Sequence, residues 1–131
     1  MLLSDVFDIQ SIKLNLESKT KDKVFEELIE TIIAVHPELD GKVMYEAINA
    51  RENKMNTSVV PGVAIPHACY PGIRDVIGAI GISRAGIEYD APGHKPVYLI
   101  LLFLMGEGSL EKHLDVLNKV FSMLNSGVFK R

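Results

Sequence analysis

Hydrophobic positions recur along this chain with two different periods, and the helical period dominates the first fifty residues. Between Lys19 and Val35 the apolar side chains return every three or four positions, as one face of an α-helix requires. Ser18 or Thr20 can cap the start of this helix, and Pro37 ends it. The inward stripe consists of Val24, Leu28, Ile32 and Val35, widened by Phe25 and Ile29.

Two further helices are predicted from the same spacing. Asp40 is placed to cap the first of them, which carries Arg51 near its end. Its inward residues are expected to be Val43, Met44, Ala47 and Ile48. Ser109 is placed to cap the other, and a turn at 125–127 ends it. The inward residues of this last helix are expected to be Leu114, Leu117, Phe121 and Leu124.

Alternating patterns and continuous apolar runs predict strands between these helices. The expected strands lie at 12–16, 62–67, 76–82, 87–89 and 97–105. The last is the most hydrophobic stretch of the chain, and we expect it in the centre of the sheet. Because strands and helices alternate, we predict an α/β fold: one domain over residues 1–131, with a mixed central sheet of about five strands flanked by helices on both faces.

The segment from Gly62 to Ala68 is the most distinctive of these strands. Pro66 cannot donate a hydrogen bond to a ladder, so we expect the strand to stop there. His67 would then stand where the chain leaves the sheet, which is a common position for a reactive side chain. A neutral imidazole in that position is a nucleophile available near neutral pH.

Composition and charge narrow the classes of protein. The chain has 131 residues, 47% hydrophobic and 24% charged, which is typical of one globular domain. A net charge of −3 gives no general attraction to nucleic acid or to anionic membranes. The longest apolar run, 96–105, is about half of the ~20 residues that a membrane helix needs. With a single cysteine and no signal-peptide pattern, we expect a soluble cytoplasmic protein that neither binds nucleic acid nor inserts into a membrane.

The four histidines are not equivalent. His36 follows a helix and precedes a proline, and His94 lies in a polar turn, so both are typical of surface positions. His113 lies in the first turn of the last predicted helix, where a half-buried structural role is the simplest interpretation. His67 alone follows a proline at a strand end, which makes it the strongest candidate for chemistry.

The sequence lacks the motifs of metal-binding, hydrolase and nucleotide-binding sites. The histidines have no metal-binding spacing, and a lone Cys69 cannot form a thiolate cluster, so neither a metal site nor a cofactor is expected. Cys69 is better explained as a small apolar filler than as a nucleophile. Ser83 and Ser109 have no hydrolase context, and no phosphate-binding glycine loop is present. If phosphate chemistry takes place here, another protein must supply the phosphoryl group.

Arg51-Glu52, a loop that contains Thr57, and Gly62-Val63-Ala64-Ile65-Pro66-His67 together carry a family resemblance. They are similar to the signature of the type-2 enzyme IIA family of the bacterial phosphoenolpyruvate-dependent phosphotransferase system, which has fructose, mannitol and nitrogen-regulatory branches. The resemblance covers nearly the whole chain. It continues through Pro71-Gly72-Ile73, the strand at 78–82, Gly86 to Asp90, Lys95-Pro96-Val97 and His113-Leu114.

The resemblance implies a role for each site residue. His67 would be the phosphorylated histidine and would use Nε2. Arg51 would lie close to the phosphate, and His113 would face His67. Phosphorylation adds roughly −1.5 to −2 charges. Arginine and hydroxyl donors would offset this charge, and Thr57 and Ser58 could supply the hydroxyls.

Ser58 and Val60 stand where the family usually has glycines, which predicts a bulkier loop with fewer backbone N–H groups facing phosphate. The family also carries more helix beyond Leu124, so the C-terminal helix is expected to be cut short in this sequence.

The same resemblance implies the partners. The histidine-containing phosphocarrier protein would donate the phosphoryl group, and a cysteine of a IIB domain would receive it during sugar uptake. The alternative is a nitrogen-regulatory protein whose phosphorylation state controls its binding to target proteins. A third interpretation, favoured only by the altered loop, is a member of the fold without phosphotransfer. The sugar itself cannot be named, because the resemblance implies that the membrane component selects it.

Overall fold

The fold is built on a five-stranded mixed sheet with strand order β1-β4-β5-β2, in which β3 also pairs with β5. The computed structural model describes residues 7–54, 62–73, 76–89 and 95–106, together with Asp115, Asn118, Lys119 and Ser122. The strands are β1 (Phe7–Lys13), β2 (Val63–Ala64), β3 (His67–Cys69), β4 (Val76–Ile87) and β5 (Val97–Met105). Only β4 and β5 are antiparallel to each other, and the remaining pairs are parallel. The predicted α/β class with a mixed sheet is confirmed.

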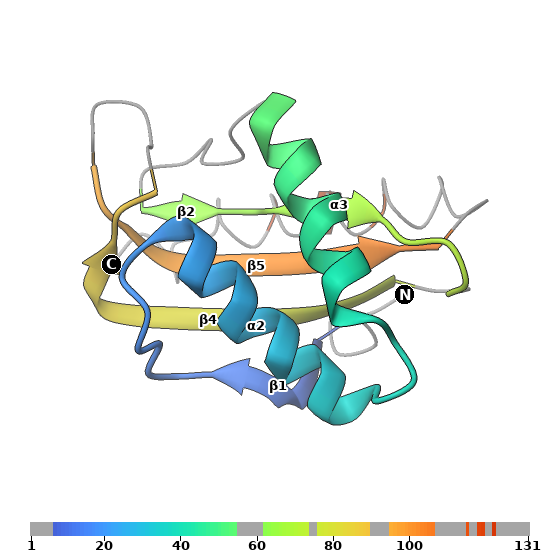
Figure 1. The fold of residues 1–131 in the computed structure, drawn as a ribbon. Coiled ribbons are helices and arrows are strands. Elements are labelled where there is room, and N and C mark those ends of the chain that lie inside the picture. Colours follow the sequence, from blue (N-terminus) through green and yellow to red (C-terminus); the bar gives the residue numbers. More distant parts are fainter. Residues whose placement is uncertain are drawn as a thin grey trace.

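Strand β5 lies at the centre of the sheet, between β4 on one side and β2 and β3 on the other, as Figure 1 shows. Its last six residues, from Ile100 to Met105, are all buried. This burial explains the continuous apolar run, because a strand covered on both faces has no need of polar positions. The predicted bounds of this strand, 97–105, agree with the structure.

Two helices, α2 (Lys21–Val35) and α3 (Gly41–Lys54), cover the same face of the sheet (Figure 1). The predicted apolar stripe of α2 packs inward through Val24, Leu28 and Ile32, each no more than 1% exposed. Thr20 occupies the N-cap position of α2 without a side-chain capping bond. Asp115, Asn118, Lys119 and Ser122 are helical, but the rest of the helix predicted from Ser109 lies outside the described residues, so a helix on the second face stays a prediction.

The start of α3 agrees with the sequence in its cap but not in one inward residue. The Asp40 carboxylate accepts hydrogen bonds from the backbone N–H groups of Lys42 and Val43, at 3.0 and 3.3 Å. Met44 and Ile48 are fully buried as predicted. Val43, expected to point inward, is instead exposed, because the side of α3 that meets the core follows Met44 and Ile48.

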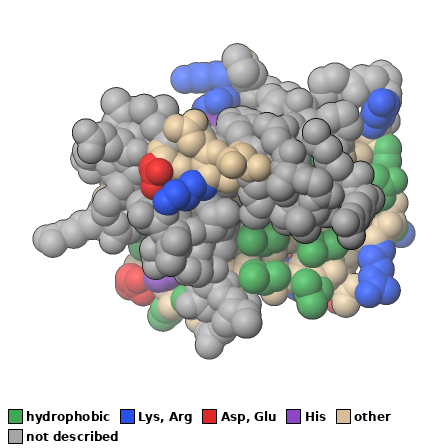
Figure 2. Space-filling model, turned by 180° about the vertical axis from the view of Figure 1, so that it is seen from behind, with side chains coloured by type: hydrophobic (Ala, Val, Ile, Leu, Met, Phe, Trp, Pro, Cys, Tyr) green, Lys and Arg blue, Asp and Glu red, His purple; other side chains and the backbone are tan. Residues whose placement is uncertain are grey.

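The first predicted strand was displaced. We expected a strand at 12–16 with an apolar face made by Ile12, Leu14 and Leu16, but β1 ends at Lys13. Ser11 is buried, while Ile12 and Leu14 are 36% and 62% exposed. The reason is the parallel pairing of β1 with β4, which places Lys13 beside Gly81 and lets its ammonium meet Glu27 of α2 at 2.9 Å. On the face opposite the helices, hydrophobic side chains of the described residues gather in one patch (Figure 2).

The strand predicted at 76–82 is longer than expected and includes only the first residue of the strand predicted at 87–89. Strand β4 runs from Val76 to Ile87 and pairs with β5 along most of its length, with a register irregularity between Ile82 and Ile87. Gly86, with φ +92°, lies inside this irregularity. Glu88 forms only an isolated bridge with Thr20, so the separate strand predicted at 87–89 was wrong. In the described part of the chain, no helix is long and apolar enough to cross a membrane.

Candidate functional site

The proline before His67 interrupts a strand without ending it. Strand β2 stops at Ala64, and β3 begins at His67, and both pair in parallel with β5. We expected His67 where the chain leaves the sheet, and this expectation was wrong. Pro66 has no N–H to donate, but its carbonyl accepts a hydrogen bond from the Phe103 N–H at 3.0 Å, which keeps the chain beside β5. The gap between two short strands therefore holds His67 on a rigid scaffold.

The imidazole of His67 is fixed by two contacts. Its Nδ1 lies 2.8 Å from the carbonyl oxygen of Ile65. A carbonyl can only accept a hydrogen bond, so Nδ1 carries the proton and Nε2 carries the lone pair. The ring stacks on Phe103, its neighbour on the adjacent strand, with centroids 5.1 Å apart and planes 11° from parallel. These contacts select one tautomer and one ring orientation.

The surroundings of His67 keep it neutral. Burial lowers the pKa of His67 below its ordinary value of 6.5, and the Arg51 guanidinium lowers it further. The hydrogen bond to Ile65 and the Glu52 carboxylate oppose this shift without reversing it. At neutral pH the side chain is therefore an uncharged nucleophile with its lone pair on Nε2.

Helix α3 packs against β3 (Figure 1), and Arg51 and Lys54 of its last turn line the same depression as His67. The start of the helix is tied to the same strand region, because the Asp40 N–H donates to the Tyr70 hydroxyl at 3.0 Å. Between helix and strand lies an open depression of about 480 Å³. Its lining consists of Ala47, Ala50, Arg51, Lys54, His67, Ala68, Cys69 and Met105.

The depression is apolar over much of its lining and positively charged along one side. Arg51 and Lys54, both in the last turn of α3, supply the charge. His67 is half-buried and Cys69 is exposed at the same surface. An open site of this kind admits a group carried by another macromolecule, and its cations suit an anion. The sequence indicated Arg51 and His67, and the structure brings them to one depression.

Glu52 was noted in the sequence only as part of a motif, and its burial could not be read there. Its side chain is 0% exposed and lies 3.5 Å from the Lys21 ammonium, measured from Oε1 to Nζ. The same ammonium lies 4.7 Å from the centre of the Tyr89 ring. The Glu52 carboxylate at the end of α3 pairs with the Lys21 ammonium at the start of α2, and the Tyr89 ring lies against the same ammonium. This contact joins the two helix ends. It thereby helps to fix the helix turn that carries Arg51.

Three of the predicted site residues, Thr57, Ser58 and His113, lie outside the described residues, as does His94. Their predicted roles are therefore untested by the geometry. His36 lies at the end of α2, 3.7 Å from Glu38, away from the depression. Within the described ranges, no group of three or more histidine, cysteine, aspartate or glutamate side chains is arranged to hold a metal ion.

The fold and the site define an α/β domain that presents a neutral histidine at an open, cationic depression. The chain belongs to the family described as "Phosphoenolpyruvate-dependent sugar phosphotransferase system, EIIA 2", whose pattern matches residues 5–130. This membership confirms the resemblance that the residues around His67 indicated.

Relatives named as fructose-specific and as nitrogen regulatory proteins are similar to this chain. It is 31% identical over 125 residues to the PTS system fructose-specific EIIABC component of Bacillus subtilis, covering 95% of this chain and 20% of that protein. It is 30% identical over 112 residues to a nitrogen regulatory protein of Pseudomonas aeruginosa, covering 86% of this chain and 73% of the relative. The chain thus spans about a fifth of the first relative and most of the second.

The fold is shared with a solved structure of the same family. The nitrogen regulatory protein IIA-Ntr from Neisseria meningitidis superposes with a TM-score of 0.88 at 30% identity. The match covers 98% of this chain and 87% of the other. The sheet and helices described here are therefore those of an enzyme IIA domain.

Proposed function

We propose that this protein is a phosphocarrier in which His67 accepts a phosphoryl group from the histidine-containing phosphocarrier protein and passes it to a IIB-type partner. The observation that carries the proposal is the fixed tautomer of His67: Nδ1 donates to Ile65, so Nε2 carries the lone pair. Family membership supports the same role. Such a relay, supplied by a soluble donor, would work in the cytoplasm.

The chemistry needs little more than position and charge. Nε2 attacks phosphorus as the P–N bond of the donor breaks and its electron pair stays on the donor ring. The donor leaves as a neutral imidazole because its other ring nitrogen carries a proton, and the Nδ1 proton of His67 remains on the product ring. Because the transition state is loose, its charge is spread over the phosphoryl oxygens, and cationic donors stabilise it. Arg51 is the donor supported by the described geometry. We propose His113, Thr57 and Ser58 as further donors.

A second function is favoured by the nitrogen regulatory relatives, one of them at 30% identity. In that case the phosphoryl group would not be passed on but would change the affinity of the protein for a target. The B. subtilis relative is named as an EIIABC component, which favours onward transfer to a IIB unit. The two functions share His67 and differ in the fate of its phosphoryl group.

The test is to incubate the protein with labelled phosphoenolpyruvate, enzyme I and the phosphocarrier protein. We expect an acid-labile phosphoprotein in wild type and none in His67→Gln, with His36→Gln as the matched control that labels normally. Equal labelling of wild type and His67→Gln would reject the assignment. Adding a fructose-type IIB domain then separates the two functions, because a relay loses its label to IIB and a regulatory protein keeps it.

A further inference from the structure

The wall of the depression contains a second cation that the family resemblance did not indicate. Lys54 is the last residue of α3, three positions after Arg51, and both side chains line the surface that His67 shares. We propose that Lys54 binds the phosphoryl oxygens of phosphorylated His67 and so stabilises the phosphorylated state. This inference rests on the proposed function of His67.

The helix geometry places the two cations together. Residues three apart on a helix lie on the same side, about 5–6 Å between Cβ atoms. Arg51 and Lys54 therefore belong to one wall, with Glu52 turned into the core between them and 0% exposed. The described residues that line the depression include these two cations and no carboxylate, a lining that suits an anionic group.

Lys54 is exposed, and within the described residues it makes no ion pair or hydrogen bond, unlike Lys13 and Lys21, which pair with glutamates. A basic residue at a helix C-terminus also interacts favourably with the helix dipole, and this alone could explain a lysine here. The helix dipole by itself does not explain why the Lys54 side chain also lines the depression that contains His67.

The two cations differ in what they can do. A guanidinium has a rigid fork suited to one geometry, whereas an ammonium on a flexible stem is a mobile point charge. We therefore assign Lys54 a role that depends on charge: it meets the phosphoryl group once the roughly −1.5 to −2 charges are present. It would favour phosphorylated over free His67, which changes the equilibrium of transfer.

The test compares Lys54→Gln with Lys54→Arg and with Lys42→Gln, a matched loss of one exposed lysine at the opposite end of α3. Each variant is equilibrated with phosphorylated phosphocarrier protein. For Lys54→Gln we expect an equilibrium constant about threefold to fivefold lower than wild type, the range of an exposed ion pair, and a difference that shrinks in high salt. Lys54→Arg and Lys42→Gln should match wild type. Equal values for Lys54→Gln and Lys42→Gln would overturn the proposal.

A second readout separates this inference from the proposed function. Phosphoramidate is a small donor: its P–N bond breaks, a bond forms from Nε2 to phosphorus, and ammonia leaves. If the phosphocarrier protein fails to label wild type, the proposed relay is rejected, but phosphoramidate labelling still tests Lys54.

A nearby ammonium lowers the second pKa of the phosphoryl group, so phosphorus NMR should show a higher pKa in Lys54→Gln than in Lys42→Gln. An identical phosphoryl pKa in the two variants would reject the contact.

Discussion

Nδ1 of His67 lies 2.8 Å from the carbonyl oxygen of Ile65, two residues earlier in the chain. Pro66 between them has no N–H to donate, but its carbonyl accepts from the Phe103 N–H of β5 at 3.0 Å, so the chain stays beside β5 while the Ile65 carbonyl faces the imidazole. The interruption of the strand and the tautomer of His67 therefore occur at the same three residues. The sequence pair Pro66-His67 matters because it lies at the gap between β2 and β3, where the Ile65 carbonyl orients the histidine.

The charges around His67 predict how its pKa responds to substitution. Arg51→Gln removes a cation that lowers this pKa and should raise it, while Glu52→Gln removes a carboxylate that raises it and should lower it. The measurement is a pH titration of the His67 ring signals by NMR. Glu46→Gln, on the exposed side of the same helix, is the control and should leave the titration unchanged. Shifts of the same sign in Arg51→Gln and Glu52→Gln would contradict this account.

The same neutral imidazole sets the pH dependence of phosphorylation. Only the unprotonated ring is a nucleophile, and burial holds the pKa of His67 below 6.5. The initial labelling rate should therefore rise with pH, with a midpoint below pH 6.5, and then reach a plateau. Arg51→Gln should move the midpoint of that rise to higher pH. A rate that continues to climb tenfold per unit above pH 7 would mean that His67 is not the titrating group.

Arg51 should contribute most of the described cationic stabilisation of the transferred group. A charge-assisted hydrogen bond is worth about 1.5–3 kcal/mol, so Arg51→Gln should reduce the rate of labelling about tenfold to a hundredfold. Arg51→Lys should fall between the two, because it keeps the charge but loses the planar fork. Arg84→Gln, an exposed arginine on β4, is the control. The rates come from quenched-flow labelling, and equal rates for Arg51→Gln and Arg84→Gln would remove Arg51 from the mechanism.

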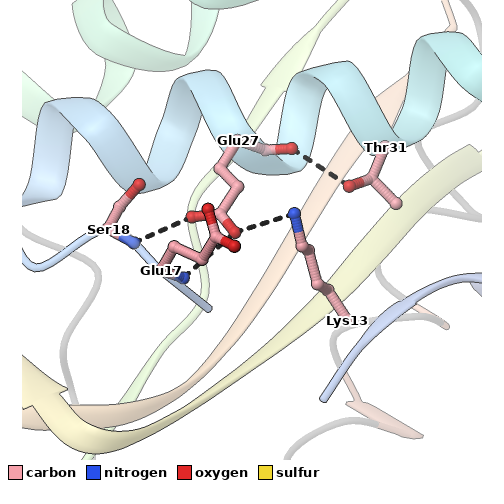
Figure 3. A network of polar contacts seen from close by, with 5 residues as sticks. All are labelled: Lys13, Glu17, Ser18, Glu27 and Thr31. Atoms are coloured by element: carbon pink, nitrogen blue, oxygen red, sulfur yellow. Dashed lines mark hydrogen bonds and ion pairs between the residues drawn. The ribbon is translucent and has the colours of Figure 1, made fainter. Parts of the chain in front are cut away.

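Stability in acid should depend on a buried carboxylate far from the site. Glu27 accepts hydrogen bonds from the backbone N–H groups of Glu17 and Ser18, at 3.2 and 3.0 Å, and pairs with Lys13 at 2.9 Å (Figure 3). Burial by itself raises the pKa of Glu27, but these partners outweigh burial and lower the pKa to about 2 from 4.5. A depressed folded-state pKa stabilises the protein above pH 4.5, and this stabilisation is lost as the pH falls toward 2.

Glu27→Gln should therefore reduce the free energy of unfolding by about 1–3 kcal/mol at pH 7. Its difference from wild type should narrow below pH 4.5. Urea unfolding at several pH values measures both effects. Glu26→Gln is the control, since its pairing with Lys23 at 3.7 Å is exposed on both sides and should contribute nothing measurable. A difference that stays constant from pH 7 to pH 2.5 would contradict the assigned network.

Two glycines with similar backbone angles should respond differently to alanine. Gly72 and Gly86 have φ values of +102° and +92°, which strain any side chain by about 1–2 kcal/mol. A Cβ at Gly72 meets nothing within 4 Å, but one at Gly86 would lie 2.9 Å from the Pro96 Cβ and 3.1 Å from the Tyr98 ring. Overpacking adds about 1–3 kcal/mol, so Gly86→Ala should be the more destabilising in thermal and urea unfolding. Equal losses would mean that the bend in β4 can relax.

The sequence pattern correctly predicted those helices and strands whose signal lies in neighbouring residues. The stripe of α2, the Asp40 cap of α3 and the unbroken apolar run of β5 are properties of neighbouring residues, and each agrees with the structure. The histidine itself could also be found, because a proline followed by a histidine at a strand end is a local feature.

The local sequence pattern did not predict how segments that lie far apart in the chain pair with one another. Ile12 and Leu14 alternate with polar residues as a strand face would, yet parallel pairing with β4 ends β1 at Lys13 and leaves both exposed. The strand predicted at 76–82 continues to Ile87, because β5 pairs with it as far as that residue. The register of a strand depends on partner residues far away in the sequence, and the hydrophobic period of a single segment does not specify those partners.

The sequence by itself determined the family and indicated His67 and Arg51 as candidate site residues, since a short motif with fixed spacing carries them. Only the tertiary structure decided that β5 holds the chain on both sides of Pro66, that Glu52 is buried against Lys21, and that Lys54 shares a depression with His67. Glu52 and Lys54 reach these positions because α3 packs against α2 and across β3, contacts between segments that have no local reason to meet. Register and packing involve residues far apart in the sequence, which a local motif does not specify.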